Sequence, residues 1–137
     1  MAQPIETAAT VADDYDAICR VVQLCLDGES TGSVEKLREA FHEDARMFGL
    51  LAGERYDVPI SEFFDMVAST PGDTGNYRAR ILSVHQTADA AFATVAEEGV
   101  WGTVSFTDYL SLARINGTWK IVNKLFAHTG GEPPEME

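Results

Sequence analysis

The stretch FTDYLSL, residues 106–112, decides the fold, because its side chains alternate between two faces. Phe106, Leu110 and Leu112 share one face, which is typical of a β-strand with one buried side. Asp108 points the same way. A carboxylate on an apolar face is costly unless it is paired, hydrogen-bonded or protonated. The stretch therefore predicts a half-buried strand whose inner face carries a functional or satisfied carboxylate, and hence a pocket.

The residues around this strand predict a sheet. Asn116-Gly117 follows it and is a strong hairpin signal, because both residue types tolerate positive φ. From Asn76 onward the hydrophobic period is two, which is typical of long antiparallel strands. Gly99 and Gly102 stand where bulges could bend such a sheet. The predicted strands cover residues 77–85, 91–98, 101–115 and 118–128.

The first half of the chain has the longer period of helices. A first helix is predicted over residues 7–27, ended by Gly28 and Gly32, and Ser33 is a candidate N-cap for a second helix that stops near residues 43–44. A strand at 46–51 and a loop at 52–57 follow. Pro59 then begins a third helix, whose buried stripe is Ile60, Phe63, Phe64 and Val67.

We therefore predict an α+β fold, in which three helices cover the concave face of a curved antiparallel sheet. Such a cone encloses more space than its side chains fill, so a ligand cavity is expected at its mouth. A chain of 137 residues that is 45% hydrophobic fits one domain, which we place at residues 1–129, with a flexible acidic tail at 130–137.

Charge and composition exclude several kinds of partner. The formal net charge is −12, from 10 Lys and Arg against 22 Asp and Glu, which argues against binding to nucleic acid or to an anionic membrane. No apolar stretch approaches the length of about 20 residues that spans a bilayer, and residues 1–14 lack the features of a secretory signal. We predict a cytoplasmic protein.

The sequence gives no sign of a metal or a cofactor. Its three histidines lie on separate predicted elements without the short spacings of zinc sites, and no glycine-rich phosphate loop is present. Cys19 and Cys25 are six residues apart on one predicted helix, about 9 Å along its axis, which is too far for a disulfide. We predict no metal, no cofactor and reduced thiols.

Three motifs resemble the nuclear transport factor 2-like superfamily, and within it the SnoaL-like and lumazine-binding group. They are Leu37-x-x-x-Phe41-His42-x-Asp44-Ala45, Phe106-x-Asp108-Tyr109-Leu110-x-Leu112, and the ending GTWKIVNKLF at residues 117–126. The resemblance covers nearly the whole chain and implies the same cone-shaped fold, also called cystatin-like. It resolves function poorly, since the superfamily includes isomerases, hydrolases, dehydratases, polyketide cyclases and members that only bind or assemble.

Ketosteroid isomerase, a member of this superfamily, gives the sharpest comparison. The resemblance places Asp108 where that enzyme keeps the neutral aspartic acid of its oxyanion hole. It also places Gly49 where the isomerase has its general-base aspartate, and Val21 or Val22 near its catalytic tyrosine. The catalytic set of the isomerase is therefore incomplete in this chain.

The last predicted strand has two half-apolar faces, so periodicity leaves its orientation open. One face carries Trp119 and Leu125, and the other carries Lys124, Phe126 and His128. Members of the superfamily commonly form homodimers through the convex face of the sheet. The resemblance thus favours Trp119 in a dimer interface and Lys124 facing the cavity.

Asp108, Lys124 and His128 are the candidate catalytic residues. With Lys124 beside it, an ionised Asp108 could act as a general base while Lys124 stabilises an oxyanion. A neighbouring cation favours the ionised carboxylate and burial favours the neutral acid, so both forms stay open. The alternative is an ion pair that only satisfies itself. His128 could reach the cavity mouth or lie idle at the strand end.

A small hydrophobic or aromatic molecule is the predicted ligand. Its candidate contacts could equally serve core packing, and His42 could instead cap the second helix. We expect a cofactor-independent lyase, isomerase or cyclase; the alternatives are a non-catalytic binding module and a dimeric accessory domain. The candidate contacts are Tyr15, Phe41, His42, Phe48, Phe63, Phe64, Phe106, Leu110 and Phe126.

Overall fold

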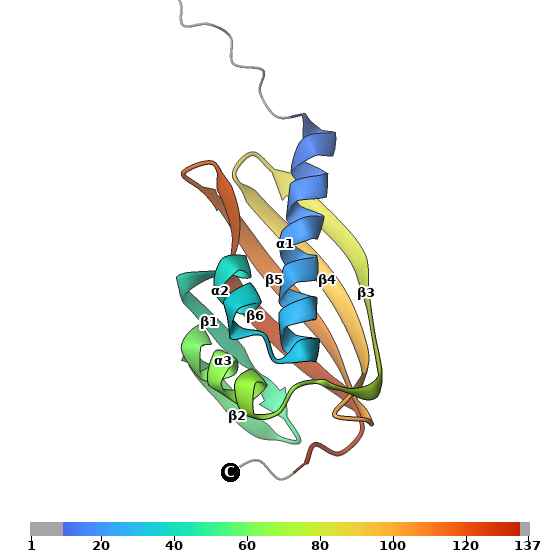
Figure 1. Ribbon diagram of the computed structural model, residues 1–137. Helices are drawn as coiled ribbons and strands as arrows, with labels where there is room; N and C mark the ends of the chain where they lie inside the picture. Colours follow the sequence, from blue (N-terminus) through green and yellow to red (C-terminus); the bar gives the residue numbers. More distant parts are fainter. Residues whose placement is uncertain (1–9, 135–137) are drawn as a thin grey trace, which may run out of the picture.

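Three helices lie against one six-stranded sheet in the computed structural model, which describes residues 10–134 (Figure 1). The α+β class is as predicted. In chain order the elements are α1 (Val11–Thr31), α2 (Val34–Ala40), β1 (Phe41–Leu51), β2 (Glu54–Pro59), α3 (Ile60–Ser69), β3 (Asp73–Thr87), β4 (Ala90–Val100), β5 (Val104–Ile115) and β6 (Thr118–Gly130).

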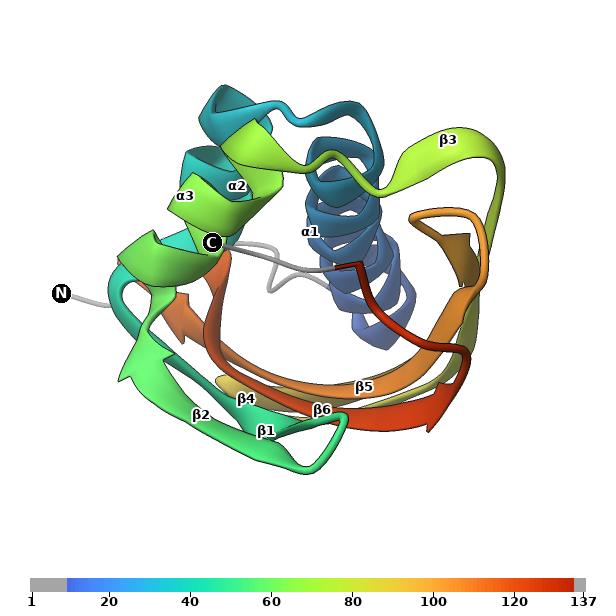
Figure 2. The ribbon, with the colours of Figure 1, turned by 90° about the horizontal axis from the view of Figure 1, so that it is seen from below.

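The sheet curves around the helices, which cover its concave face as predicted (Figure 2). Its strand order is β2-β1-β6-β5-β4-β3. The sheet is mixed rather than wholly antiparallel, because β1 and β6 pair in parallel while the other neighbours pair antiparallel. The parallel pair joins the first and last strands of the chain. The middle of the sheet is therefore complete only when the last strand, β6, is in place.

Capping fixes the limits of α1. The side chain of Thr10 accepts a hydrogen bond from the backbone of Asp13, whose own side chain accepts from Thr10. The helix continues past Gly28 to Gly32, where φ is 80°. Gly28 was predicted to end the helix and instead allows close packing, since a Cβ there would lie 2.8 Å from Leu37 Cδ2. The predicted start at residue 7 lies outside the described residues.

Two boundaries after α2 differ from the prediction. Strand β1 begins at Phe41, because this side chain turns into the core, with its ring 6.1 Å from Phe63 and 5.8 Å from Phe64. Residues predicted as a loop form β2, an edge strand in which only Tyr56 and Val58 are half-buried, between exposed neighbours. At the other end β6 extends to Gly130, and residues 135–137 of the predicted tail lie outside the described part.

A bulge in β6 explains why its two faces looked alike. Leu112 of β5 pairs with Ile121, but the preceding Ser111 pairs with Asn123, so Val122 is an extra residue. After Val122 the side chains alternate between the two faces again, but shifted by one residue. Trp119 and Ile121 therefore lie in the same core as Phe126, and the predicted place of Trp119 in a dimer interface is wrong.

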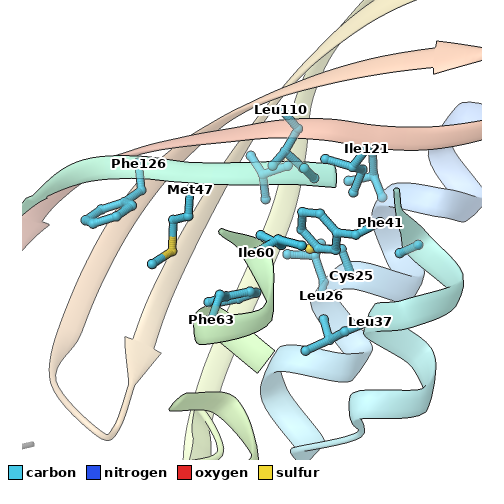
Figure 3. Packing of buried hydrophobic residues seen from close by; sticks show 14 of the residues in the cluster. Cys25, Leu26, Leu37, Phe41, Met47, Ile60, Phe63, Leu110, Ile121 and Phe126 are labelled. Atoms are coloured by element: carbon cyan, nitrogen blue, oxygen red, sulfur yellow. The ribbon is translucent and has the colours of Figure 1, made fainter. Parts of the chain in front are cut away.

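Figure 3 shows how the core fills the space between sheet and helices. Leu110 and Ile121 from the sheet point toward Phe41 and Cys25, while Met47 and Phe126 lie further along the same face. Cys25 is buried and Cys19 partly so, and both are free thiols. Among the described residues, no helix has the length and apolar character to cross a membrane.

Gly49 of β1 has no room for a side chain. It is buried, and a Cβ would lie 2.5 Å from the backbone oxygen and 2.7 Å from Cδ1 of Phe126. We predict that Gly49→Ala lowers the free energy of unfolding by about 1–3 kcal/mol, as overpacking does. Urea unfolding measures this. Gly130→Ala is the control, since its Cβ would meet nothing nearer than 3.9 Å. Equal midpoints for the two variants would contradict the close approach.

Candidate functional site

A narrow cavity lies between the sheet and the helices α1 and α3. The centre of a water molecule can reach about 40 Å³ of it, which is room for a few waters or a small ligand group. Its walls are mostly apolar, with two acidic side chains and one lysine among them. The lining includes Met47, Leu51, Phe63, Val67, Phe106 and Phe126, together with Glu29, Asp108 and Lys124.

Asp108 and Lys124 form a buried ion pair on this wall. Lys124 Nζ lies 2.8 Å from Asp108 Oδ2, and the two side chains are only 3% and 2% exposed. The strands bring them together because Leu110 of β5 pairs with Lys124 of β6, two residues along the same face from Asp108. Lys124 Nζ also lies 4.7 Å from the ring centroid of Phe63. Asp108 and Lys124, which were predicted to be neighbours in the hairpin, are thus in direct contact.

Two glutamates that were not predicted as site residues lie beside this ion pair. Glu29 on α1 and Glu97 on β4 are 7% and 1% exposed. Carboxyl oxygens of Glu29, Glu97 and Asp108 all lie within 4.8 Å of one another. The hydroxyl of Tyr77 donates to Glu97 Oε2 at 3.0 Å. We call Glu29, Glu97, Asp108 and Lys124 the carboxyl–lysine cluster.

One of these glutamates carried the same signal as Asp108. Ala91, Ala93 and Val95 are the buried positions of β4, and Glu97 continues their alternation. Glu29 had no such signal, because the predicted end of the first helix at Gly28 placed it in a turn. The continuation of α1 turns Glu29 into the interior.

Burial dominates the electrostatics of the cluster. It raises the pKa of Glu97 well above the ordinary value of 4.5, and the nearby carboxyls of Glu29 and Asp108 raise it further. Burial likewise raises the pKa of Glu29, against the opposing effect of Lys124. For Lys124, burial alone would lower the pKa, but the three carboxyls outweigh it and hold the pKa well above 10.5.

The cluster lacks hydrogen-bond donors if every carboxyl is ionised. Glu29 Oε2, Glu97 Oε1 and Asp108 Oδ1 are buried and face no donor among the described residues. Three carboxylates and one ammonium would also leave a net charge of −2 in an apolar interior. Two protons on the carboxyls would neutralise the cluster and supply the missing donors.

His128 is not part of this cluster, although it was predicted as a catalytic residue together with Asp108 and Lys124. Its Nδ1 accepts from the backbone of Ala52 at 3.1 Å, and its Nε2 lies 3.0 Å from the oxygen of Gly130. A neutral ring with its proton on Nε2 satisfies both contacts. His128 thus ties the turn after β1 to the end of β6, and it does not line the cavity.

The candidate ligand contacts divide into three groups. Phe63, Phe106 and Phe126 line the cavity. Phe41, Phe64 and His42 instead line a separate surface groove beside α2 and α3. The remaining candidates contact neither, since Leu110 is packed in the core while Tyr15 and Phe48 are 49% and 40% exposed. Strand alternation turns Phe48 to the convex face, opposite Met47.

The prediction of no metal site rested on histidine spacing, which says nothing about carboxylates. Among residues 10–134, Glu29, Glu97 and Asp108 are the group with oxygens close enough to share an ion. In this cluster the ammonium of Lys124 already brings a positive charge to Asp108. We therefore read these carboxyls as acid–base groups.

Comparison with known proteins agrees with the architecture. The family model described as "putative lumazine-binding" matches residues 13–127. The aldolase FrzH of Cladobotryum sp is 27% identical over 115 residues, covering 84% of this chain and 91% of that protein.

Solved structures show the same fold. An NTF2-like protein of unknown function from Shewanella baltica has a TM-score of 0.81 at 25% identity, covering 89% of this chain and 98% of its own. Another, from Methylobacillus flagellatus, has a TM-score of 0.79 at 30% identity, covering 92% of this chain and 99% of its own. The predicted superfamily and fold are confirmed.

The raised pKa of Glu97 makes a prediction about stability. The unfolded chain releases this proton near pH 4.5, whereas the folded protein keeps it, so wild-type stability falls as the pH rises above that value. The loss from this group is up to about 1.4 kcal/mol per pH unit, until the folded carboxyl itself ionises. Glu97→Gln removes the loss, so we expect the variant to gain stability over wild type with rising pH.

Urea unfolding across a pH series measures this gain. Glu98→Gln is the matched control, because Glu98 is the exposed neighbour on the same strand. Parallel stability curves for wild type and Glu97→Gln would show that Glu97 is ionised in the folded protein.

Proposed function

The chain belongs to the family described as "putative lumazine-binding", and on that premise we propose that it is a small-molecule enzyme that moves protons on a carbonyl compound. The observation that carries the proposal is the geometry of Asp108. One oxygen is held 2.8 Å from Lys124 Nζ, and the other has no donor among the described residues. Both residues line the same apolar cavity.

This geometry suits removal of a proton from a carbon beside a carbonyl group. Asp108 Oδ1 is the base, and the ammonium of Lys124 stabilises the negative charge that develops on the carbonyl oxygen. The low polarity of the cavity strengthens that attraction. The side chains of the cluster suffice for these proton transfers, so the proposal invokes no cofactor.

Carbon–carbon bond chemistry is the reaction class that we favour within this proposal. The relative from Cladobotryum is named an aldolase, which makes it a lyase. Lys124 is unsuited to forming an imine with the substrate, because its pKa is held well above 10.5 and an ammonium is not a nucleophile. An enolate formed by Asp108 is the route that remains. Isomerisation of a steroid is disfavoured, since Gly49 has no room for the aspartate base of that enzyme.

Binding without catalysis is the second candidate, and one observation favours it. Asp108 and Lys124 satisfy each other, and the cavity is small, so the pair could simply hold a ligand group in place. The catalytic proposal requires turnover, whereas this alternative requires only a rise in melting temperature with ligand.

A homodimer through the convex face is part of the proposal. Phe48, Leu125 and Tyr109 are neighbours across β1, β6 and β5, and Phe92 stacks on Tyr109 with ring centroids 5.9 Å apart. All four are at least 37% exposed. Such a continuous apolar row suits burial against a second copy. The cytoplasmic location and the domain limits at residues 1–129 stay predictions.

The catalytic proposal is tested by hydrogen exchange in D2O. We expect the wild type to accelerate exchange of α-hydrogens in members of a panel of small aldehydes and ketones, followed by proton NMR. Asp108→Asn should lower the rate about 10²–10⁴-fold, as loss of a general base does. Lys124→Met should also lower it, since the oxyanion loses its cation. Asp57→Asn, an exposed surface change, is the control. Compounds that raise the melting temperature without any exchange would favour the binding alternative.

The dimer is tested at Leu125, in the middle of the apolar row. We expect sedimentation to show a dimer for the wild type and a monomer for Leu125→Glu, because a carboxylate there would be buried against the second copy. Ile115→Glu, at the exposed end of β5, should leave the dimer intact. A wild-type monomer at all concentrations would rule out this interface.

A further inference from the structure

We propose that Glu29 is the catalytic acid of this site and that Glu97 returns the proton from Asp108 to Glu29 after each turnover. The inference rests on the proposed function and deepens it. It assigns a donor to the second half of an aldol-type reaction, for which Asp108 and Lys124 provide only the first half.

Position separates the roles of the two glutamates. Glu29 lines the cavity together with Asp108 and Lys124, whereas Glu97 does not. A substrate in the cavity can thus touch Glu29 and Asp108 at once. Glu97 lies behind them, with a carboxyl oxygen within 4.8 Å of those of both partners. Glu97 is therefore a positioning and relay residue, held by the hydroxyl of Tyr77.

Counting charges shows where the protons are. The groups that face one another from α1, β3, β4, β5 and β6 are Cys25, Glu29, Tyr77, Glu97, Asp108 and Lys124. Burial raises the pKa of the Cys25 thiol and of the Tyr77 hydroxyl, so both stay neutral. Lys124 is positive. Neutrality then needs one negative carboxylate, and Asp108 is the carboxylate in contact with the ammonium.

Glu29 and Glu97 are therefore the protonated carboxyls. Their raised pKa values support this placement, and a carboxyl oxygen of Glu97 lies within 4.8 Å of those of both Glu29 and Asp108. A proton on Glu97 gives Asp108 Oδ1 or Glu29 the donor that each lacks. Glu29 Oε2 has no hydrogen-bond partner among the described residues and Glu29 lines the cavity, so a proton on this oxygen can be donated to a ligand.

The reaction closes without a net change in protons. Asp108 takes a proton from the α-carbon of one carbonyl group, and the released electron pair forms a bond to the carbon of a second carbonyl group. The π pair of that second group moves to its oxygen, which takes the proton of Glu29. Asp108 is then protonated and Glu29 ionised, and Glu97 passes one proton on to Glu29 while it receives one from Asp108. Cleavage of the bond follows the same steps in reverse.

The same arrangement defines a class of substrate. Among the described residues that line the cavity, Glu29 and the Asp108–Lys124 pair offer hydrogen-bond donors to a carbonyl oxygen, but the one cation is already paired and leaves none for a carboxylate or phosphate. A substrate that is uncharged at its reacting end, either two small carbonyl compounds or one molecule with two carbonyl groups, fits these walls. Anionic substrates are disfavoured, because the nearest cation is already paired with Asp108.

Two measurements test the inference. The first is carbon-13 NMR of protein labelled at the glutamate carboxyl carbon. At pH 7 we expect two resonances at the position of neutral carboxyls, one lost in Glu29→Gln and the other in Glu97→Gln. Glu35→Gln, at an exposed site on α2, should remove only an ordinary ionised signal.

The second measurement separates the two halves of the reaction. Glu29→Gln should slow carbon–carbon bond formation or cleavage about 10²–10⁴-fold. It should slow α-hydrogen exchange by a smaller factor, because that half of the reaction uses Asp108 and Lys124. Glu97→Gln should complete a first turnover and slow later ones, since an amide cannot relay the proton. A structural role alone would slow both reactions of Glu29→Gln equally.

The outcomes distinguish this inference from the proposed function. Exchange by the wild type together with an ionised Glu29 at pH 7, or equal losses in both reactions of Glu29→Gln, would overturn the inference alone. Two neutral carboxyls without exchange of any compound would overturn the proposed function and the acid role of Glu29 with it.

Discussion

The ammonium of Lys124 among three buried carboxyls is the polar interaction that links helix α1 to the middle of the sheet. The groups of this cluster stabilise one another. Lys124 forms an ion pair with Asp108, and the surrounding carboxyls raise the pKa of Lys124 against the effect of burial. The groups come from α1, β4, β5 and β6. The cluster therefore forms only when helix and sheet have packed together, which ties the chemistry to the complete fold.

How much of this was predictable depends on how local each signal is. Asp108 was recognisable because its neighbours on the same face are apolar within one unbroken strand. Periodicity alone left the face of Lys124 open, because the extra residue Val122 changes the face of every later residue, and the resemblance was needed to favour the cavity side. Glu29 was hidden by Gly28, whose role is packing against Leu37 rather than ending the helix. The three helices and the run of later strands followed from period alone, while the edge strand β2 and the parallel pairing of β1 with β6 depend on tertiary contacts.

Comparison with ketosteroid isomerase shows how one scaffold position can serve different chemistry. Asp108 matches an acid of the isomerase that is kept neutral by an apolar site. Here Lys124 forms an ion pair with Asp108, and the carboxyls whose pKa values burial raises are those of Glu29 and Glu97. Gly49 occupies the position of the isomerase's base, and the backbone of Phe126 leaves no room there for a side chain. The position of the isomerase's neutral acid thus carries one half of a buried ion pair in this chain, and the position of its base carries no side chain.

Stability gives a reason to regard the cluster as functional. Replacing a buried ionic group with apolar residues of similar volume is often neutral or stabilising, so folding does not require these four side chains. A cluster kept only for structure would be expected to satisfy every polar atom, as Asp14 does with Arg114 and Gln86 at the other end of the sheet. In the carboxyl–lysine cluster three oxygens lack donors in the ionised state, and two of their residues border the cavity. The protons that would satisfy them are mobile by nature, and a ligand in the cavity is the partner to which they can be given.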